Sequence, residues 1–474
     1  MKRTCVVIGG GISGMSTAIL LAKQGFDVTL VERASRLAPL VRGFSRQGMH
    51  FETGFHHTGY LEQGEILDRA FKVMGLTGIE SFPLGLGSDQ RVVVDGGPTE
   101  GYPMSSGFVR LLDVLGDYFP QERSPLQNYL NSVEKTQNSS PYLALDASGP
   151  RETPYRDSTL AEVLDSLFTD NRLKSILASQ VLYHGVPPAE VSFVFHAWVG
   201  AAALRSLRTI KGGGKSLVQA FERALEYAGV RVETGRGVNR VIVSPAGALA
   251  GVCLEDGQAL ETKICVSTVH PALLADLIPE GIFRPAYTNR LARLPETPRA
   301  AMVFGMIPTN SDVAPGNSWL FLEGHNPACW FGVEDRRGPG AMSVMISDPG
   351  GDNGMASLEL AACSAPDVSK YELKEHLIQS YMQRLPSLYQ RTQFLEVASP
   401  STFARFTNSP FGSYYGPQHA VGVHPPQPRT RLPGFYLAGQ AVVAPGIAGA
   451  VISACVAVDV MLGGDTVLKE LRQC

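Results

Sequence analysis

The feature that most constrains the fold of this chain is a glycine-rich turn between a short apolar run and a segment with helical periodicity. The run Thr4–Ile8 is apolar and rich in β-branched residues, and residues 9–14 follow it directly with the spacing G-x-G-x-x-G. Residues 15–24 have the apolar pattern of a helix that ends at a glycine, and residues 27–31 have the composition of a strand. The sequence therefore predicts a strand, a tight turn, a helix and a second, parallel strand.

Each glycine of this turn has its own physical reason. Gly9 permits the tight turn, Gly11 lets a pyrophosphate approach the backbone, and Gly14 lets the helix pack closely on the strand. The free N–H groups at the helix N-terminus bind phosphate, and the Glu32 carboxylate can accept hydrogen bonds from both ribose hydroxyls. Because strand, helix and acid are all in place, we predict a dinucleotide site that prefers FAD or NAD to NADP.

The composition argues against several kinds of partner and site. Charged residues make up 18% of the chain and the net charge is −3, so we expect no nucleic-acid-binding surface. This low charge suits an apolar ligand. The seven cysteines contain no Cys-x-x-Cys pair, which argues against a disulfide framework or a metal site and favours a reducing compartment. The expected location is therefore cytoplasmic.

Two uncharged stretches, residues 4–22 and 433–458, are long enough to span a membrane. The first is explained by the strand and the glycine-rich turn, and the second is interrupted by Gly439, Pro445, Gly446 and Gly449. We therefore expect no spanning segment, and the composition is compatible with peripheral contact with a membrane.

A second glycine-rich sequence, at residues 211–216, resembles a phosphate loop. A Walker A motif needs a glycine where this chain has Thr209, so ATP binding is not expected. Residues 212–267 are expected to continue the dinucleotide domain, and residues 136–156 have the composition of a linker. Thr159 to Glu162 is a capping box that begins a helix. Further predicted helices span 65–74, 173–182, 217–227 and 372–384, and further predicted strands span 91–95, 230–232, 238–243 and 250–254.

The C-terminal part contains a strand ending in glycine, residues 432–440, and then Pro-Gly-Ile-Ala-Gly-Ala at 445–450, which begins an apolar helix. Together with residues 9–14 and Glu32, these segments resemble the flavoprotein superfamily of amine oxidases and phytoene desaturases. Three internal stretches are similar to its retinol saturase and carotenoid isomerase branch: Phe-Glu-Thr-Gly-Phe-His at 51–56, Pro-Ala-Glu-Val-Ser-Phe at 188–193, and Gly-Ser-Tyr-Tyr-Gly at 412–416.

This resemblance implies an α/β fold with a Rossmann-type FAD-binding domain, similar to those of glutathione reductase and amine oxidases, and an interleaved α+β substrate domain. The expected FAD-binding domain is discontinuous and consists of residues 1–80, 210–285 and 405–474. The expected substrate domain, which includes a helical lobe, consists of residues 81–209 and 286–404. We expect residues 160–199 and 289–406 to form an apolar tunnel that reaches the flavin.

The resemblance also implies how FAD lies. The pyrophosphate is expected at residues 11–14, the ribose at Glu32, the adenine near Arg33 and the backbone of Val238, and the flavin ring against residues 439–447. The usual Gly-Gly pair after Glu32 is replaced by residues 39–43. The expected cofactor-binding residues are Gly9, Gly11, Ile12, Ser13, Gly14, Glu32, Arg33, Arg42, Val238, Gly439, Gln440, Gly446 and Ile447.

A flavin carries the hydride transfer, so the protein has to orient the substrate and handle at most one proton. His56 matches a motif position near the flavin, and its alternative role is to shape the loop. Tyr415 and His419 lie just before the flavin-side strand, where a phenol or imidazole could deliver a proton. These three residues are the expected catalytic candidates, whereas His184 and His196 are expected in the core.

Three functions remain open from the sequence. The first is an FAD enzyme that saturates, desaturates or isomerises a C=C bond in an apolar polyene or isoprenoid. The second is a flavin amine oxidase, and the third is a non-catalytic binder of prenyl chains, like the Rab escort and dissociation-inhibitor proteins. Because only one glycine-rich βαβ unit is predicted, net oxidation or reduction would need an external electron donor or acceptor.

Overall fold

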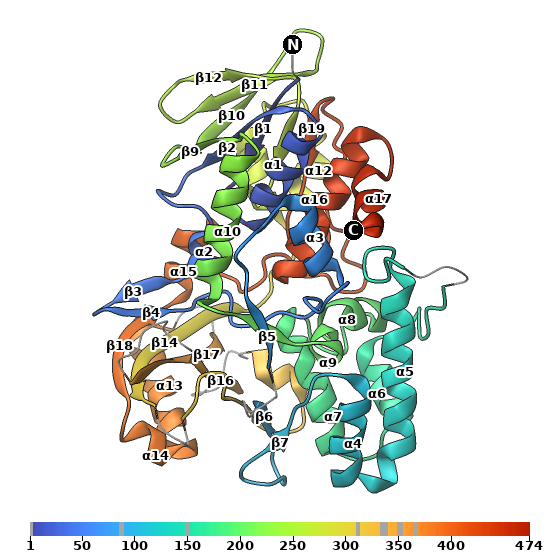
Figure 1. Cartoon of the computed structure of the whole chain (residues 1–474), viewed down its shortest axis with the longest axis vertical. Helices are drawn as coiled ribbons and strands as arrows, with labels where there is room; N and C mark the ends of the chain where they lie inside the picture. The colour runs from blue at the N-terminus through green and yellow to red at the C-terminus, as the bar shows by residue number, and fades with distance from the viewer. Residues whose placement is uncertain are drawn as a thin grey trace.

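A five-stranded parallel sheet is the centre of the upper half of the molecule (Figure 1). The structure, a computed structural model, describes residues 3–84, 90–146, 151–309, 313–331, 340–347, 354–364 and 368–474. Three separate parts of the chain contribute to this sheet. In spatial order its strands are β19 (Phe435–Leu437), β13 (Cys265–Ser267), β1 (Thr4–Ile8), β2 (Asp27–Glu32) and β9 (Arg231–Thr234).

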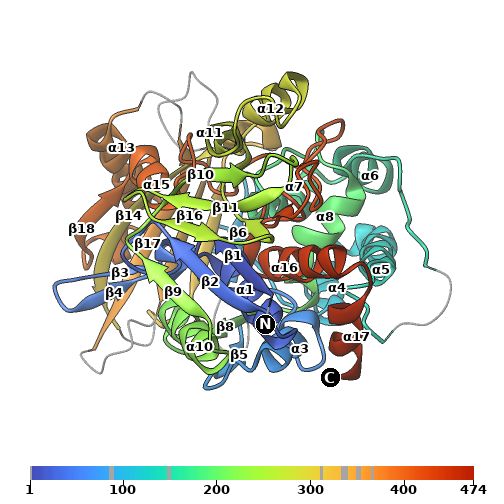
Figure 2. The same cartoon turned by 90° about the horizontal axis from the view of Figure 1, so that it is seen from above.

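Both faces of the parallel sheet are covered, which explains why the four buried residues of β1, Cys5 to Ile8, are all apolar. Cys5 and Val7 pack with the helices on one face, and Val6 and Ile8 pack with a small antiparallel sheet on the other (Figure 2). The helices are α1 (Ile12–Lys23), α3 (Ile66–Met74), α10 (Gly213–Tyr227), α16 (Gly446–Leu462) and α17 (Thr466–Gln473). The small sheet consists of β10 (Val238–Val243), β11 (Leu249–Leu254) and β12 (Ala259–Glu261).

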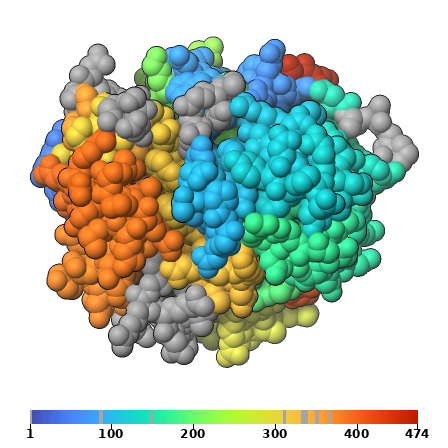
Figure 3. Space-filling model, turned by 90° about the horizontal axis from the view of Figure 1, so that it is seen from below, coloured from blue at the N-terminus to red at the C-terminus, as the bar shows by residue number. Residues whose placement is uncertain are grey.

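The lower half contains a sheet lobe and a helical lobe, which lie side by side (Figures 1 and 3). Strands β6 and β7, at one edge of the sheet lobe, lie on the side toward the helical lobe. The seven strands of the sheet lobe are, in spatial order, β18 (Gln393–Ala398), β14 (Arg299–Pro308), β17 (Met355–Ser364), β16 (Ala341–Ser347), β15 (Ser318–Leu322), β6 (Gln90–Val93) and β7 (Tyr102–Pro103). Helix α13 (Lys370–Arg384) packs on this sheet. The helical lobe consists of α4 (Phe108–Tyr118), α5 (Arg123–Ser139), α6 (Leu160–Leu167), α7 (Asn171–Ala178), η2 (Ser179–Tyr183), α8 (Phe193–Val199) and α9 (Ala202–Arg205).

Most elements predicted from local signals are present. Strand β1 has the predicted bounds, and α1 begins three residues before residue 15, at Ile12. The capping box of Thr159 and Glu162 is formed at the start of α6. The linker predicted at residues 136–156 is wrong in its first part, because α5 continues to Ser139 and buries Thr136 and Gln137; residues 147–150 lie outside the described residues.

No helix among the described residues is long and apolar enough to cross a membrane. The uncharged stretch at 433–458 supplies most of α16, whose apolar side chains are buried against α1 and the parallel sheet. The five-stranded and seven-stranded sheets are built from different parts of the chain, and we keep the two-domain boundaries given above as a proposal.

Candidate functional site

One cavity of about 1260 Å³ is lined by the half with the parallel sheet, by the sheet lobe and by the helical lobe. It begins at the carboxyl ends of β1 and β2, passes the N-termini of α1 and α16, and continues between η2 and α8 of the helical lobe and the seven-stranded sheet. In open parallel sheets, ligands bind outside the carboxyl ends of the strands. The cavity is therefore where the fold places a cofactor and a substrate together.

The turn before α1 has the geometry of a phosphate site. Gly9 has a φ of +102°, and a side chain there would collide with Thr268. A Cβ on Gly14 would overlap the carbonyl oxygen of Gly9, so this glycine allows close packing of helix and strand and does not line the cavity. In contrast, a Cβ on Gly11 would meet nothing within 4 Å. The space beside Gly11, at the start of a 12-residue helix, is open to a ligand.

The Glu32 carboxylate is held at the cavity wall by the backbone. It accepts hydrogen bonds from the N–H groups of Gly10, at 2.6 Å, and Ala34, at 2.7 Å. Each carboxylate oxygen retains a lone pair, so the group can also accept hydrogen bonds from a ribose. Arg33 and Val238 line the same end of the cavity, as do Ile12 and Ser13.

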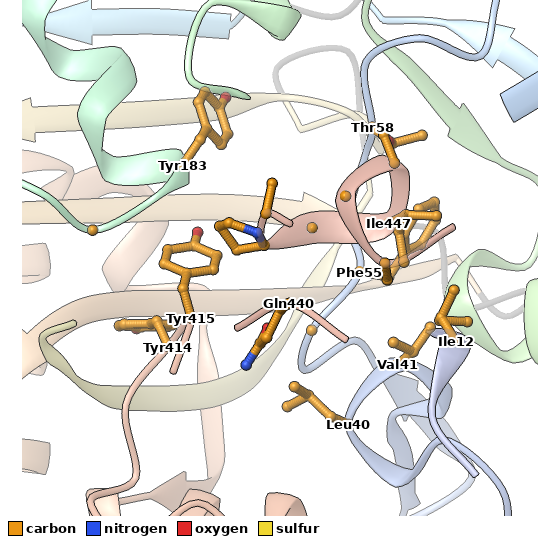
Figure 4. A pocket seen from close by; sticks show the side chains of 18 of the residues that line it. Ile12, Leu40, Val41, Phe55, Thr58, Tyr183, Tyr414, Tyr415, Gln440 and Ile447 are labelled. Atoms are coloured by element: carbon orange, nitrogen blue, oxygen red, sulfur yellow. The ribbon is translucent and has the colours of Figure 1, made fainter. Parts of the chain in front are cut away.

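The second helix N-terminus faces the same cavity from the C-terminal part of the chain. Gly439, with a φ of +114°, donates its N–H to Ser453 Oγ at 2.8 Å and brings the chain out of β19. Gly446 has a φ of +82°, and the space beside it is open, where α16 begins. The side chain of Gln440 lies in the cavity between Ile12 and the tyrosines at its other side, and Ile447 lines it as well (Figure 4). Two helix N-termini, open glycines and one carboxylate fit an extended dinucleotide.

Arg42 is placed away from this cavity, contrary to the expected cofactor contact. Its guanidinium pairs with Glu222 of α10 and donates from Nε to the Leu37 carbonyl at 3.2 Å. Residues 39–42 form the short helix α2 (Pro39–Arg42), so Leu40 and Val41 face the cavity and Arg42 faces α10. We therefore leave Arg42 out of the proposed site.

His56 and His57 both line the cavity, but their environments differ. Burial lowers the pKa of His56 to about 3, and its buried Nδ1 lacks a partner among the described residues. His57 Nε2 lies 3.1 Å from the hydroxyl oxygen of Tyr183 in η2, and burial lowers the pKa of His57 to about 4. Both imidazoles are therefore neutral near pH 7. The pair of His57 and Tyr183 was missed from the sequence because the two residues are far apart in the chain.

Of the two adjacent tyrosines at 414 and 415, the first is fixed by the backbone. The Tyr414 hydroxyl is 3.1 Å from the carbonyl oxygens of both Ala301 and Ala362. Tyr415 lines the cavity near Tyr183, and burial raises the pKa of its phenol (Figure 4). Its backbone N–H donates to Thr297 Oγ1 at 3.1 Å. Tyr415 is thus presented to the cavity as a neutral phenol.

His419 does not line the cavity, which contradicts its expected contact with the substrate. Its Nε2 donates to the Gln440 carbonyl at 2.9 Å, and its ring stacks on Phe195 with centroids 4.8 Å apart. Burial lowers the pKa of His419. The residue positions the Gln440 loop from behind. His184 and His196 are buried in the helical lobe with 3.2 Å between Nε2 and Nδ1, as expected of core residues.

The glycine-rich sequence at 211–216 forms the N-terminus of α10, but a side chain of the protein occupies it. The Glu52 carboxylate accepts the N–H of Gly214 at 3.2 Å, and a Cβ on Gly213 would collide with this carboxylate. His50 Nε2 lies 3.4 Å from Glu52. Glu359 of β17 is buried nearby, and burial together with Glu52 raises its pKa to about 8. The Glu359 carboxyl group is therefore protonated and uncharged near pH 7. A carboxyl group of the protein therefore occupies this helix terminus in place of a phosphate.

Comparison with known proteins agrees with this geometry. The chain is similar to the all-trans-retinol 13,14-reductase of Macaca fascicularis, with 24% identity over 95% of this chain and 84% of the relative. It is also similar to the hydroxyneurosporene desaturase of Cereibacter sphaeroides, with 24% identity over 92% of each chain. The crystal structure of an oxidoreductase from Methanosarcina mazei has the same fold, with a TM-score of 0.69 and 18% identity over 97% of this chain and 100% of the other.

Residues 12–462 match the family model described as flavin containing amine oxidoreductase. This match begins at the first residue of α1, includes both lobes and the loop before α16, and ends at the last residue of α16. The expected Rossmann-type fold and the expected FAD cofactor are confirmed. The chain belongs to the family of flavin-containing amine oxidoreductases and is a flavin-dependent oxidoreductase.

Proposed function

We propose that this protein uses FAD to saturate, desaturate or isomerise a C=C bond in an apolar polyene or isoprenoid. The observation that carries the proposal is the continuation of the cavity past the loop before α16 into a chamber with mostly apolar walls. Both lobes contribute to these walls, as expected for a tunnel that reaches the cofactor. The side chains include Leu84, Val92, Leu182, Phe195, Trp319 and Met345.

The names of the similar proteins support this substrate class. The relatives include a retinol 13,14-reductase and carotenoid desaturases, whose names specify long conjugated or isoprenoid molecules. A mostly apolar chamber gains about 25 cal/mol for each Å² of apolar surface that a bound ligand removes from water. A hydrocarbon chain of this kind is therefore a better match to the chamber than a charged metabolite.

The proposed cofactor contacts follow the geometry of the two helix termini. The backbone of residues 11–13 would hold the pyrophosphate, Glu32 the ribose, and Arg33 and Val238 the adenine end. Residues 439–440 and 446–447 would contact the ring system. When bound, the flavin supplies hydride transfer to or from a carbon atom. His56 and Tyr415 remain predicted as residues near the reacting carbon atoms.

The test is anaerobic. The purified protein is loaded with FAD, the flavin is reduced by light in the presence of a sacrificial electron donor, and apolar alkenes are added while the oxidised flavin band is recorded. We expect a polyene or isoprenoid alkene to restore the band, and the fully saturated analogue, as a matched control, to leave the flavin reduced. If no apolar alkene reoxidises the flavin or is isomerised, the proposal is rejected.

A flavin amine oxidase remains the second candidate because two tyrosines from different segments, Tyr183 and Tyr415, line the cavity. Such an enzyme needs aromatic rings near the flavin, which could not be placed from sequence alone. The same preparation separates the two functions, because an amine substrate would bleach the oxidised flavin without oxygen. Bleaching by amines together with no response to alkenes would favour this candidate.

We further propose an external electron donor or acceptor for net reduction or oxidation. The N-terminus of α10, which resembles a second nucleotide loop in sequence, contains the Glu52 carboxylate. No disulfide bond joins cysteines among the described residues, which supports the cytoplasm as the location. Peripheral contact with a membrane would let an apolar substrate enter the cavity without passing through water.

A further inference from the structure

We propose that Tyr183, hydrogen-bonded to His57, is the acid that protonates the substrate carbon next to the one that receives hydride. This inference rests on the proposed function and specifies the saturation direction. It names a pair of residues outside the candidates expected from sequence motifs.

The geometry of the pair is defined by two segments that meet in the cavity. Tyr183 is the last residue of η2, and His57 belongs to the loop after β4 (Met49–Phe51). The Tyr183 hydroxyl oxygen is 3.1 Å from His57 Nε2, and the two rings meet edge to face with centroids 5.6 Å apart. Both side chains line the cavity. In Figure 4, Tyr183 and Tyr415 lie on the side of the view opposite to Ile12, with Gln440 between.

The other polar rings near the cavity are less suited to donate a proton. The Tyr414 hydroxyl is committed to two backbone carbonyls. His419 lies outside the cavity lining and donates to the Gln440 carbonyl. The Nδ1 atom of His56 is buried, and a neutral imidazole is a poor acid. Tyr183 differs from Tyr415 because its oxygen has an imidazole partner among the described residues.

The chemistry of the pair suits proton donation. Burial raises the pKa of Tyr183 to about 12, so the phenol holds its proton near pH 7. His57 is neutral, and in the tautomer that carries hydrogen on Nε2 it donates to the Tyr183 oxygen. The phenol proton is then free to point into the cavity. A hydrogen bond from His57 also stabilises the phenolate that remains after proton transfer.

The step balances as follows for a C=C bond. Hydride from the reduced cofactor forms one C–H bond, and the O–H bond of Tyr183 breaks to form the other, while the π bond of the alkene is lost. The alkene is reduced by two electrons, and the cofactor is oxidised by two. The phenolate regains a proton from solvent. Acid catalysis of this kind contributes typically 10²–10⁴-fold in rate.

The test compares Tyr183→Phe with a control, Tyr142→Phe. Tyr142 also lines the cavity, but its hydroxyl donates to Asp459 Oδ2 at 3.4 Å. The reduced holoenzyme is mixed with the alkene that reoxidises the wild type. We expect Tyr183→Phe to slow alkene-dependent reoxidation by about 10²–10⁴-fold. Reoxidation by oxygen and the affinity for the alkene should stay within about threefold, and His57→Gln, which can still donate a hydrogen bond, should retain more activity than His57→Ala.

A second readout does not depend on turnover. The ring ¹⁵N signals of His57, recorded on the flavin-free protein, should show hydrogen on Nε2 and should shift in Tyr183→Phe. If the wild type reacts with alkenes and Tyr183→Phe reacts within threefold of it, the inference is overturned while the proposed function stands. A loss in Tyr415→Phe without one in Tyr183→Phe assigns the proton to Tyr415 and also overturns it. If no alkene reacts with the wild type, the proposed function falls and the inference falls with it.

Discussion

Helices α1 and α10 both begin at glycine-rich turns, but the surroundings of their N-termini are opposite. At α1 the space beside Gly11 is open and faces the large cavity. At α10 the spaces beside Gly213 and Gly214 are taken by the Glu52 carboxylate and the Val41 carbonyl. Both termini attract negative charge through their free N–H groups. The first is left for a ligand, and the second is occupied by a side chain of the protein.

The comparison shows what a glycine-rich sequence can and cannot predict. Both sequences have glycines followed by a good helix, so the local signal for a helix N-terminus is similar. The difference comes from residues distant in the chain, since Glu52 precedes α10 by 161 positions and reaches it only in the folded state. The surrounding packing decides whether such a terminus is a binding site.

The largest expected effect is on stability and separates the two turns directly. Gly214→Ala places a Cβ against the backbone carbonyl of Val41, which cannot move away easily, so we expect a loss of about 3 kcal/mol or more in the free energy of unfolding. Gly11→Ala adds a Cβ into open space at a φ of −73°, which alanine adopts without strain. Its free energy of unfolding should change by less than about 0.5 kcal/mol in urea denaturation of the flavin-free protein. Equal losses in the two variants would contradict the comparison.

The next effect concerns Glu32, the acid beside the glycine-rich turn before α1. Glu32→Ala should weaken FAD binding by about 10- to 1,000-fold, because it removes one or two charge-assisted hydrogen bonds. Glu32→Gln serves as the matched variant, since it keeps the shape and removes the charge. Titration of the apoprotein with FAD, followed by flavin fluorescence, measures both. Wild-type affinity in Glu32→Ala would remove Glu32 from the site.

A third prediction tests the two buried acids, Glu52 and Glu359, near the N-terminus of α10. The pKa of Glu359 is about 8 in the fold and 4.5 in its ordinary state, so between these values the folded protein holds a proton that the unfolded chain has lost. The free energy of unfolding should therefore fall as pH rises from about 5 to about 8, by on the order of 4 kcal/mol. Glu359→Gln should remove much of this slope, and Glu52, whose pKa is also raised, should account for the remainder. An unchanged slope in Glu359→Gln would contradict the assignment.

The smallest expected effect is the absence of a reaction. Because the α10 terminus contains Glu52, it offers no place for a second nucleotide, and we expect oxidised enzyme to react slowly or not at all with NADPH alone. Stopped-flow mixing without oxygen provides the measurement. Bleaching of the flavin band on the order of 1 s⁻¹ or faster would show a nicotinamide site elsewhere.

The sequence predicts those parts of the fold that local signals determine. The βαβ unit, the capping box at Thr159 and the helix after Gly446 are all encoded by turn residues and periodicity within about 30 positions. The seven-stranded sheet was not predicted in detail. Its pairing of β6 with β15 joins residues 90–93 to 318–321, and no local pattern specifies such a partner.

In the candidate site, too, local sequence signals predict some positions, and contacts between distant segments determine the others. The sequence predicts Gly11 and Glu32 on the same side of the sheet because strand ends and helix starts fix their directions, and both line the cavity. Arg42 was placed wrongly because its direction depends on Glu222 in another element. His419 was placed near the right loop, but its side chain turns to the backbone of Gln440 and not to the cavity. The partnership of His57 with Tyr183 depends on the packing of the helical lobe, which the sequence does not specify.

The central claim is that the open turn before α1 binds FAD, and the affinity of Gly11→Val for FAD tests it most directly. A Cβ at this position has no other atom within 4 Å, and the side chain of valine would extend into the space of the pyrophosphate. We predict that FAD binds this variant more than about 1,000-fold more weakly than the wild type, while the flavin-free proteins unfold at the same urea concentration. A Gly11→Val protein that purifies with a full complement of FAD would contradict the account.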